Sequence, residues 1–240
     1  MKSSQSRVML VTGAAGGLGS ALSMAAAVNG WQVIMLDKNE RGLERHFDAI
    51  VAAGGVEPCL QPMDLAVIGP ADCQQLSAAL YHQFGGLDAV VHCAVAFQGL
   101  QPLDLIQSDE WLRQVQVNVN APWLITINLL PLLRSRDKSG LVFILDKQAD
   151  EKGLWGCYGV CKSAVRGLAA QFKSELASTN IYVHAVDPGP MRTALRLSVF
   201  HSENPSNVTS AEIKAKKLLS ILETAAKHQD FHICLDDVRS

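Results

Sequence analysis

The sequence is poor in charged and aromatic side chains, and it contains no long apolar run. Of its 240 residues, 18 % are charged and 6 % are aromatic, and the formal net charge is only −2. This balance gives no electrostatic reason to expect nucleic acid or an anionic membrane as a partner. The apolar runs are short and interrupted, so no membrane-spanning helix is expected. We therefore expect a protein that binds neither nucleic acid nor membrane.

The start of the chain also lacks the apolar segment of a secretory signal peptide. Only residues 8–11 are continuously apolar before Gly13, which is too short for such a segment. We expect a cytoplasmic protein, whose six cysteines would be free thiols. Cys157 and Cys161 lack the spacing and the clustered histidines of a zinc site, so no metal is expected.

Hydrophobic residues make up 48 % of the chain, which is enough for a sizeable core. Short runs of aliphatic and β-branched residues alternate with longer segments of helical periodicity. This alternation predicts an α/β fold over residues 1–240, a single doubly wound, Rossmann-like domain with helices on both faces of a parallel sheet. A loop at about residues 190–210, rich in Pro, Ser and Asn, is expected to cover a substrate. About seven strands are expected, at residues 8–13, 31–37, 56–65, 87–95, 140–146, 181–189 and 231–235.

A glycine-rich loop follows the first expected strand and opens a helix. Gly13, Gly17 and Gly19 permit a tight turn and a close approach to a pyrophosphate, and the helix N-terminus supplies free N–H groups. Asp37 ends the second strand, where a carboxylate can accept hydrogen bonds from an adenosine ribose. A carboxylate there would repel a 2′-phosphate, so NAD(H) is favoured over NADP(H), although Lys38 weakens this preference. The alternatives are that the glycine loop is only a tight turn between strand and helix, and that Asp37 is only a polar residue at the end of a strand.

A tyrosine and a lysine lie one helical turn apart further along the chain. Tyr158 and Lys162 are four positions apart, so they share one face of a helix. The ammonium group of Lys162 would favour the phenolate form of Tyr158, which suits a proton-transfer site. Between Ile144 and Cys157 there is no serine or threonine. The pair therefore lacks a neighbouring aliphatic hydroxyl that could donate to a substrate oxygen.

Together these motifs resemble the short-chain dehydrogenases/reductases over essentially the whole chain, and within them the bacterial YciK-type branch. The resemblance implies an NAD(P)(H)-dependent oxidoreductase that interconverts an alcohol and a carbonyl compound. Tyr158 would give or take the proton, with Lys162 and Asn118 as its catalytic partners. A small-molecule substrate and a homodimer or homotetramer are also implied. The cofactor-binding residues implied are Thr12, Gly13, Gly17, Leu18, Gly19, Asp37, Asp64, Leu65, Cys93, Ala94, Tyr158, Lys162, Pro188, Gly189 and Thr193.

The chain departs from the family pattern at three places. The family's catalytic serine, counted back from Tyr158, falls on Leu145 or Asp146. Asp146 could replace it as a donor only when protonated; Lys147 or Gln148 could donate instead, or the loop could have lost its role. The family's Asn-Asn-Ala-Gly segment is residues 92–95 here, where His92 is expected as a structural replacement. The YciK-type branch usually has arginine in place of Asp37.

These departures leave a second class of function open. A dinucleotide-binding protein with little or no catalysis, serving as a sensor or scaffold, would also keep the glycine loop and Asp37. A methyltransferase has a similar loop and acid, but it leaves Tyr158 and Lys162 unexplained.

Overall fold

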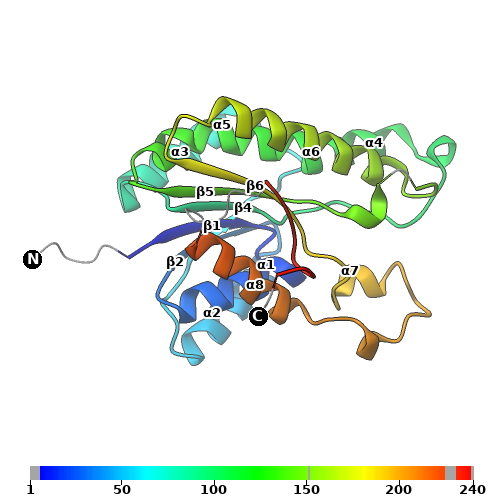
Figure 1. Cartoon of the computed structure of the whole chain (residues 1–240), viewed down its shortest axis with the longest axis horizontal. Coiled ribbons are helices and arrows are strands. Elements are labelled where there is room, and N and C mark those ends of the chain that lie inside the picture. The colour runs from blue at the N-terminus through cyan, green and yellow to red at the C-terminus, as the bar shows by residue number, and fades with distance from the viewer. Residues whose placement is uncertain (1–5, 151, 225–230, 239–240) are drawn as a thin grey trace, which may run out of the picture.

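A computed structural model describes residues 6–150, 152–224 and 231–238. Seven strands in this part of the chain form one parallel sheet in the order β3-β2-β1-β4-β5-β6-β7 (Figure 1). The expected doubly wound sheet is therefore confirmed. Six of the seven expected strands are present within narrower bounds, and the strand expected at residues 140–146 begins one residue earlier, at Ser139. The strands are β1 (Val8–Thr12), β2 (Gln32–Asp37), β3 (Cys59–Pro62), β4 (Ala89–His92), β5 (Ser139–Ile144), β6 (Ile181–Asp187) and β7 (His232–Cys234).

Helices cover both faces of the sheet (Figure 1). The upper face in this view carries α3 (Pro70–Phe84), α4 (Ser108–Val115), α5 (Ala121–Arg134) and α6 (Gly156–Glu175). The lower face carries α1 (Gly17–Val28), α2 (Glu40–Ala52) and α8 (Ala211–Glu223). The shorter elements are the helix α7 (Ala194–Leu197) and the 3₁₀ turns η1 (Leu103–Leu105), η3 (Lys147–Ala149) and η4 (Pro205–Asn207). No helix in the described ranges is long and apolar enough to cross a membrane.

The sheet separates two apolar layers, and this explains why its strands have no polar face. Successive side chains of a strand point to opposite faces. In β1, Leu10 belongs to the layer beneath α3, α5 and α6, whereas Met9 and Val11 belong to the layer beneath α1 and α8. Every residue of β1 is buried, as is every residue of β5. The continuous apolar runs in the sequence therefore correspond to strands covered on both sides.

Residues 103–134, which precede β5, have helical spacing in the sequence, but this helical segment is interrupted in the structure. Between α4 and α5 the backbone forms a π-helical turn, η2 (Gln116–Asn120), which contains Asn118. Side-chain periodicity does not reveal a single π-turn, because the apolar pattern continues on either side of it. Such turns occur frequently at functional sites, and this one lies beside the cavity described next.

Candidate active site

A cavity of about 340 Å³ lies at the carboxyl ends of the strands, where ligands bind in open parallel sheets. Every predicted catalytic or cofactor-binding residue lines it except Thr12 and Asn118. These two lie behind the cavity wall. Thr12 Oγ1 accepts a hydrogen bond from the Ala94 N–H at 3.2 Å, and the Asn118 amide pairs with both backbone groups of Ala96 at 2.9 and 2.8 Å. Both side chains thereby fix the segment that follows β4.

The glycine loop makes close backbone contacts that a side chain would prevent. Gly13 has a φ of +68°, and a Cβ there would lie 2.7 Å from the Ala94 backbone. A Cβ on Gly19 would lie 2.2 Å from the Gly13 carbonyl oxygen. Helix α1 begins directly after this turn, and no side chain caps its N-terminus. The loop therefore presents a helix N-terminus to the cavity, an arrangement suited to phosphate.

The far end of the cavity contains the acids predicted to contact adenosine. Asp37 accepts hydrogen bonds from the backbone N–H groups of Ala15 at 3.1 Å and Asn39 at 3.0 Å, one on each carboxylate oxygen. Lys38 lines the cavity next to it. Asp64 accepts a hydrogen bond from the Ala66 N–H at 3.0 Å. The Asp37 carboxylate thus holds the glycine loop in place, and each of its oxygens keeps a second lone pair toward the cavity that it lines.

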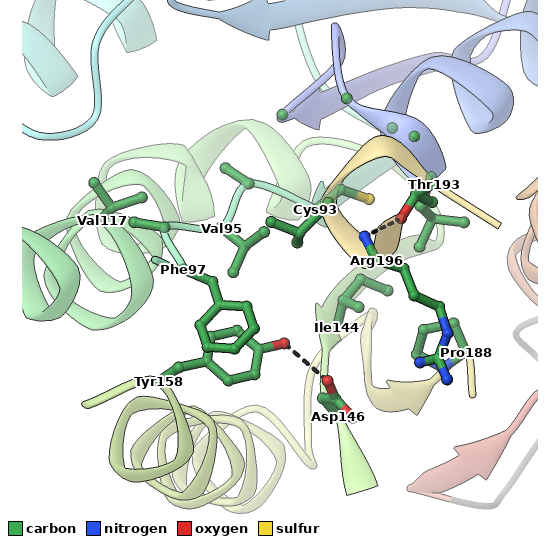
Figure 2. A pocket seen from close by; sticks show the side chains of 18 of the residues that line it. Cys93, Val95, Phe97, Val117, Ile144, Asp146, Tyr158, Pro188, Thr193 and Arg196 are labelled. Atoms are coloured by element: carbon green, nitrogen blue, oxygen red, sulfur yellow. Dashed lines mark hydrogen bonds between the residues drawn. The ribbon is translucent and has the colours of Figure 1, made fainter. Parts of the chain in front are cut away.

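Tyr158 and Asp146 form the central contact of the site (Figure 2). The phenol oxygen of Tyr158 donates to Asp146 Oδ2 at 3.0 Å, and Asp146 Oδ1 accepts from the Gln148 N–H at 3.0 Å. Burial raises the pKa of Tyr158 well above its ordinary value, and Asp146 and Asp187 raise it further. Burial and the two acidic neighbours thus oppose the phenolate form that Lys162 is expected to favour, and that expectation stays a prediction.

Lys162 lies one turn further along α6 and is almost fully buried. Its Nζ donates to the Ile144 carbonyl oxygen at 2.8 Å and lies 5.4 Å from the centre of the Tyr158 ring. Burial lowers the pKa of Lys162, and the charge of Asp146 opposes that shift. The tyrosine, the lysine and the acid predicted from the sequence are thus brought together at the end of β5.

Two residues of the site were missed by the sequence analysis. Asp187 ends β6 and accepts a hydrogen bond from the Gly189 N–H at 2.9 Å; burial raises its pKa. Its position in the sequence, at the end of an expected strand and directly before Pro188, could have identified it as a candidate site residue. Arg196 of α7 donates to Gln148 Oε1 at 3.0 Å. No sequence signal could have shown that contact, because it joins segments far apart in the chain.

The other polar residues discussed from the sequence are structural. His92 is buried, bonds Thr126 Oγ1 at 2.9 Å and stacks on Phe143. Burial lowers its pKa to about 3, so it is uncharged. The Sγ atoms of Cys157 and Cys161 lie 3.8 Å apart as free thiols. The described residues contain no cluster of three or more histidine, cysteine or acidic side chains that could hold a metal.

Known proteins of similar sequence and structure share this architecture. The oxidoreductase YciK of Escherichia coli (strain K12) is 34 % identical over 209 residues, covering 86 % of this chain and 82 % of that protein. A short chain dehydrogenase from Shigella flexneri 2a (strain 301), solved with NADP, superposes with a TM-score of 0.90 at 28 % identity, over 96 % of this chain and 97 % of its own. Another, from E. coli CFT073 and solved with NADPH, gives a TM-score of 0.89 at 30 % identity, over 95 % of this chain and 96 % of its own.

The cofactor preference predicted from Asp37 is wrong. NAD was favoured over NADP because a free carboxylate would repel a 2′-phosphate, but both of these structural neighbours are complexed with NADP or NADPH. The structure gives a physical reason for the error. Both Asp37 oxygens accept backbone N–H groups, and the cationic Lys38 lines the cavity beside them.

The sequence model of the short chain dehydrogenase family matches residues 7–204. This range includes the glycine loop, Asp146, the Tyr158–Lys162 pair and the turn after β6. The matched relatives agree with it in both sequence and fold. The chain belongs to the short-chain dehydrogenase/reductase family of oxidoreductases.

Proposed function

We propose that this protein is an NADP(H)-dependent oxidoreductase that interconverts an alcohol and a carbonyl compound, with Tyr158 as the proton donor in reduction. The observation that carries the proposal is the buried Tyr158 phenol, one helical turn from Lys162, in a cavity that continues to the glycine loop. Oxidation of NADPH by a panel of carbonyl compounds tests it. Binding of NADPH without turnover of any carbonyl would contradict it.

The cavity wall fits a dinucleotide along its length. The uncapped N-terminus of α1 and the close glycine turn suit the pyrophosphate, and Asp64 and Leu65 suit the adenine. Lys38, which lines the cavity beside Asp37, would meet a 2′-phosphate. Pro188, Gly189 and Lys162 also line the cavity and would hold the nicotinamide and its ribose, together with Thr193, whose side chain lies against Gly17. The cofactor would supply or accept the hydride.

Tyr158 would carry the proton of the reaction. In reduction its O–H gives a proton to the carbonyl oxygen while the carbonyl carbon accepts a hydride, which yields the alcohol. In the structure this O–H is directed at Asp146, so a substrate oxygen has to replace the carboxylate as acceptor. Protonated Asp146 would then be the second donor to that oxygen, in place of serine, while ionised Asp146 would repel the developing alkoxide. We therefore expect slow turnover on ordinary test substrates.

We propose that Lys38 recognises the additional phosphate of NADP(H). Replacing Lys38 with alanine should weaken NADPH binding several-fold, since one charged hydrogen bond is lost. NADH binding should change little, because NADH has no 2′-phosphate. Calorimetric titration of the wild-type protein and the Lys38→Ala variant with NADPH and with NADH gives the loss of affinity for each cofactor. Replacing the exposed Glu40, two residues further on, with alanine provides the control. Equal losses of affinity for NADPH and NADH in Lys38→Ala would contradict the assignment of Lys38 to the 2′-phosphate.

A catalytically impaired dinucleotide-binding protein is the second candidate. It is favoured by one observation, the engagement of the Tyr158 hydroxyl by Asp146 where the family has serine. On this alternative NADPH binds tightly and no carbonyl compound is turned over. The carbonyl panel therefore separates the two proposals directly.

We also propose that the chain is a single domain, in which the loop of residues 190–210 closes over the substrate. The two ends of this loop meet at the pairing of Arg192 with Ser210, and the Arg192 N–H donates to the Thr209 carbonyl oxygen at 2.9 Å. Arg196, near the middle of the loop, reaches Gln148 on the opposite wall of the cavity. These contacts support a loop that is already folded over the reacting end.

Assembly into a homodimer or homotetramer is a further proposal. The outer surfaces of α5 and α6 expose apolar side chains, among them Trp123, Ile127 and Val160. Exposed apolar groups of this size on adjacent helices suit a protein–protein contact. Light scattering should give the mass of two or four chains, and a monomer at micromolar concentration would contradict the proposal.

A further inference from the structure

Aromatic rings from three separate segments meet beside the reactive phenol. The Phe97 ring lies 4.5 Å from the Tyr158 ring at an interplanar angle of 32°, and Trp155 stacks on Phe97 at 5.6 Å. Phe200, in the loop after α7, lies 6.2 Å from Trp155. All four residues line the cavity. Figure 2 shows the Phe97 ring beside the Tyr158 ring.

Only part of this aromatic cluster is covered by protein. Trp155 and Tyr158 are buried, whereas Phe97 and Phe200 are half-buried and keep surface toward the cavity. Half-buried rings at a cavity wall offer flat apolar faces and edges to a ligand, and a second ring packs well against them in stacked or edge-on arrangements. The wall beside Tyr158 is therefore suited to a planar group.

The acidic groups at this end disfavour an anionic substrate. Asp146 accepts the Tyr158 hydroxyl, and Asp187 faces the same cavity from the end of β6. A carboxylate attached to the reacting carbonyl would lie close to both. Like charges in a partly buried site repel strongly because solvent screens them poorly.

The cations that line the cavity near this end each have a partner within the protein, and the charge of Lys162 acts on Asp146 and Asp187 themselves. The Arg196 guanidinium is held between Glu203 and Gln148, and it lies over the Phe200 ring at 4.5 Å from the ring centre. Two further cations line the described part of the cavity near this end. Lys162 donates a hydrogen bond to the Ile144 carbonyl, and Arg113 forms a salt bridge with Glu110.

We propose that the substrate is an uncharged aryl aldehyde or aryl ketone whose ring lies against Phe97 and Phe200 while its carbonyl oxygen meets Tyr158. This inference rests on the proposed function and specifies its substrate class. The planar ring fits the aromatic wall, and the absence of charge avoids Asp146 and Asp187. The loop that carries Phe200 and Arg196 would complete the cover over the ring.

Binding to the protein loaded with NADP⁺ tests this class without any turnover, because the oxidised cofactor cannot reduce a ketone. Calorimetry compares acetophenone, cyclohexyl methyl ketone and benzoylformate. We expect acetophenone to bind about two- to tenfold more tightly than the cyclohexyl ketone, the range of an aromatic pair contact. Benzoylformate, which adds a carboxylate beside the same ketone, should bind more weakly than acetophenone. Equal or tighter binding of either comparison compound would overturn the proposal.

Two variants locate the contact. Phe97→Leu and Phe200→Leu keep an apolar side chain but remove the ring, so each should reduce the preference for acetophenone over the cyclohexyl ketone toward unity. Tyr81→Leu, on the exposed surface of α3, is the matched control and should leave the preference unchanged. Phe200 lies in a loop, so its variant remains informative if the Phe97 variant fails to fold. An unchanged preference in the folded variants would contradict the proposal.

The same titrations separate failure of this inference from failure of the proposed function. Binding of NADP⁺ without binding of acetophenone overturns the substrate class and leaves the cofactor assignment intact. Absence of NADP⁺ binding contradicts the proposed function itself, and with it the inference that depends on it.

Discussion

Replacing Asp146 with serine should raise kcat/KM for carbonyl reduction about a hundredfold. A hydrogen-bond donor aimed at developing negative charge on oxygen contributes on the order of 10²–10³ in rate, and ionised Asp146 cannot supply it. The substitution also removes the acceptor that now holds the Tyr158 hydroxyl at 3.0 Å. Steady-state kinetics of wild type and variant with the same aryl ketone and NADPH measures the gain.

Asp146→Ala is the matched control, because it removes the carboxylate without adding a donor. It should gain less than the serine variant, since only the repulsion and the competing acceptor are lost. Equal rates for the serine and alanine variants would contradict the claim that a donor is missing at this position. Lower rates than wild type in both would show instead that Asp146 itself donates in its protonated form.

A second readout does not depend on the substrate. Asp146 is one of the groups that raise the pKa of Tyr158, so both variants should lower that pKa. The pKa of Tyr158 is measured from the ultraviolet absorbance of the phenolate as a function of pH. The Tyr158→Phe variant shows which part of the absorbance change belongs to Tyr158. Because burial is the larger cause, the pKa should fall only part of the way toward its ordinary value of about 10.

Tyr158→Phe should abolish the activity that the wild type has. The substitution removes the hydroxyl that donates the proton and leaves the ring that packs between Phe97 and Trp155. General acid catalysis contributes typically about 10²–10⁴ in rate, so kcat should fall by at least that order. The measurement is NADPH oxidation with the best carbonyl substrate of the panel.

The affinity for NADPH should change much less than the rate, because Lys162 and the glycine loop remain. Tyr81→Phe removes an exposed hydroxyl on α3 and should leave kcat unchanged. Unchanged kcat in Tyr158→Phe would remove Tyr158 from the mechanism, and a loss of NADPH binding of the same size as the loss of rate would assign it to the cofactor instead.

Much of the fold could be predicted because the strands are buried on both faces. Continuous apolar runs such as residues 8–11 have few alternatives to a central parallel strand once helical segments alternate with them. The bounds were less accurate at β3, where only Cys59–Pro62 pairs with β2 although a longer segment was expected. The π-turn at Gln116–Asn120 was not predicted, because helical periodicity resumes on either side of it.

In the candidate site, features encoded within one short segment could be predicted from the sequence, whereas features that depend on contacts between distant segments could not. The glycine loop and the Tyr158–Lys162 pair were found because each is encoded within one short segment. The groups that raise the pKa of Tyr158 could not be found in that way, because burial, Asp146 and Asp187 act on it together from separate segments. The cofactor preference was wrong because it rested on Asp37 alone, whereas Lys38 lines the cavity beside it and both structural neighbours are complexed with NADP or NADPH.

In the proposed reaction Tyr158 protonates a carbonyl oxygen while NADPH reduces the carbonyl carbon. Mass spectrometry of the alcohol formed from acetophenone and NADPH deuterated at nicotinamide C4 follows both groups at once. We expect deuterium at the carbinol carbon with the wild-type protein, more product with Asp146→Ser, and none with Tyr158→Phe. Equal labelled product from wild type and Tyr158→Phe, or no labelled alcohol from wild type and Asp146→Ser alike, would contradict it.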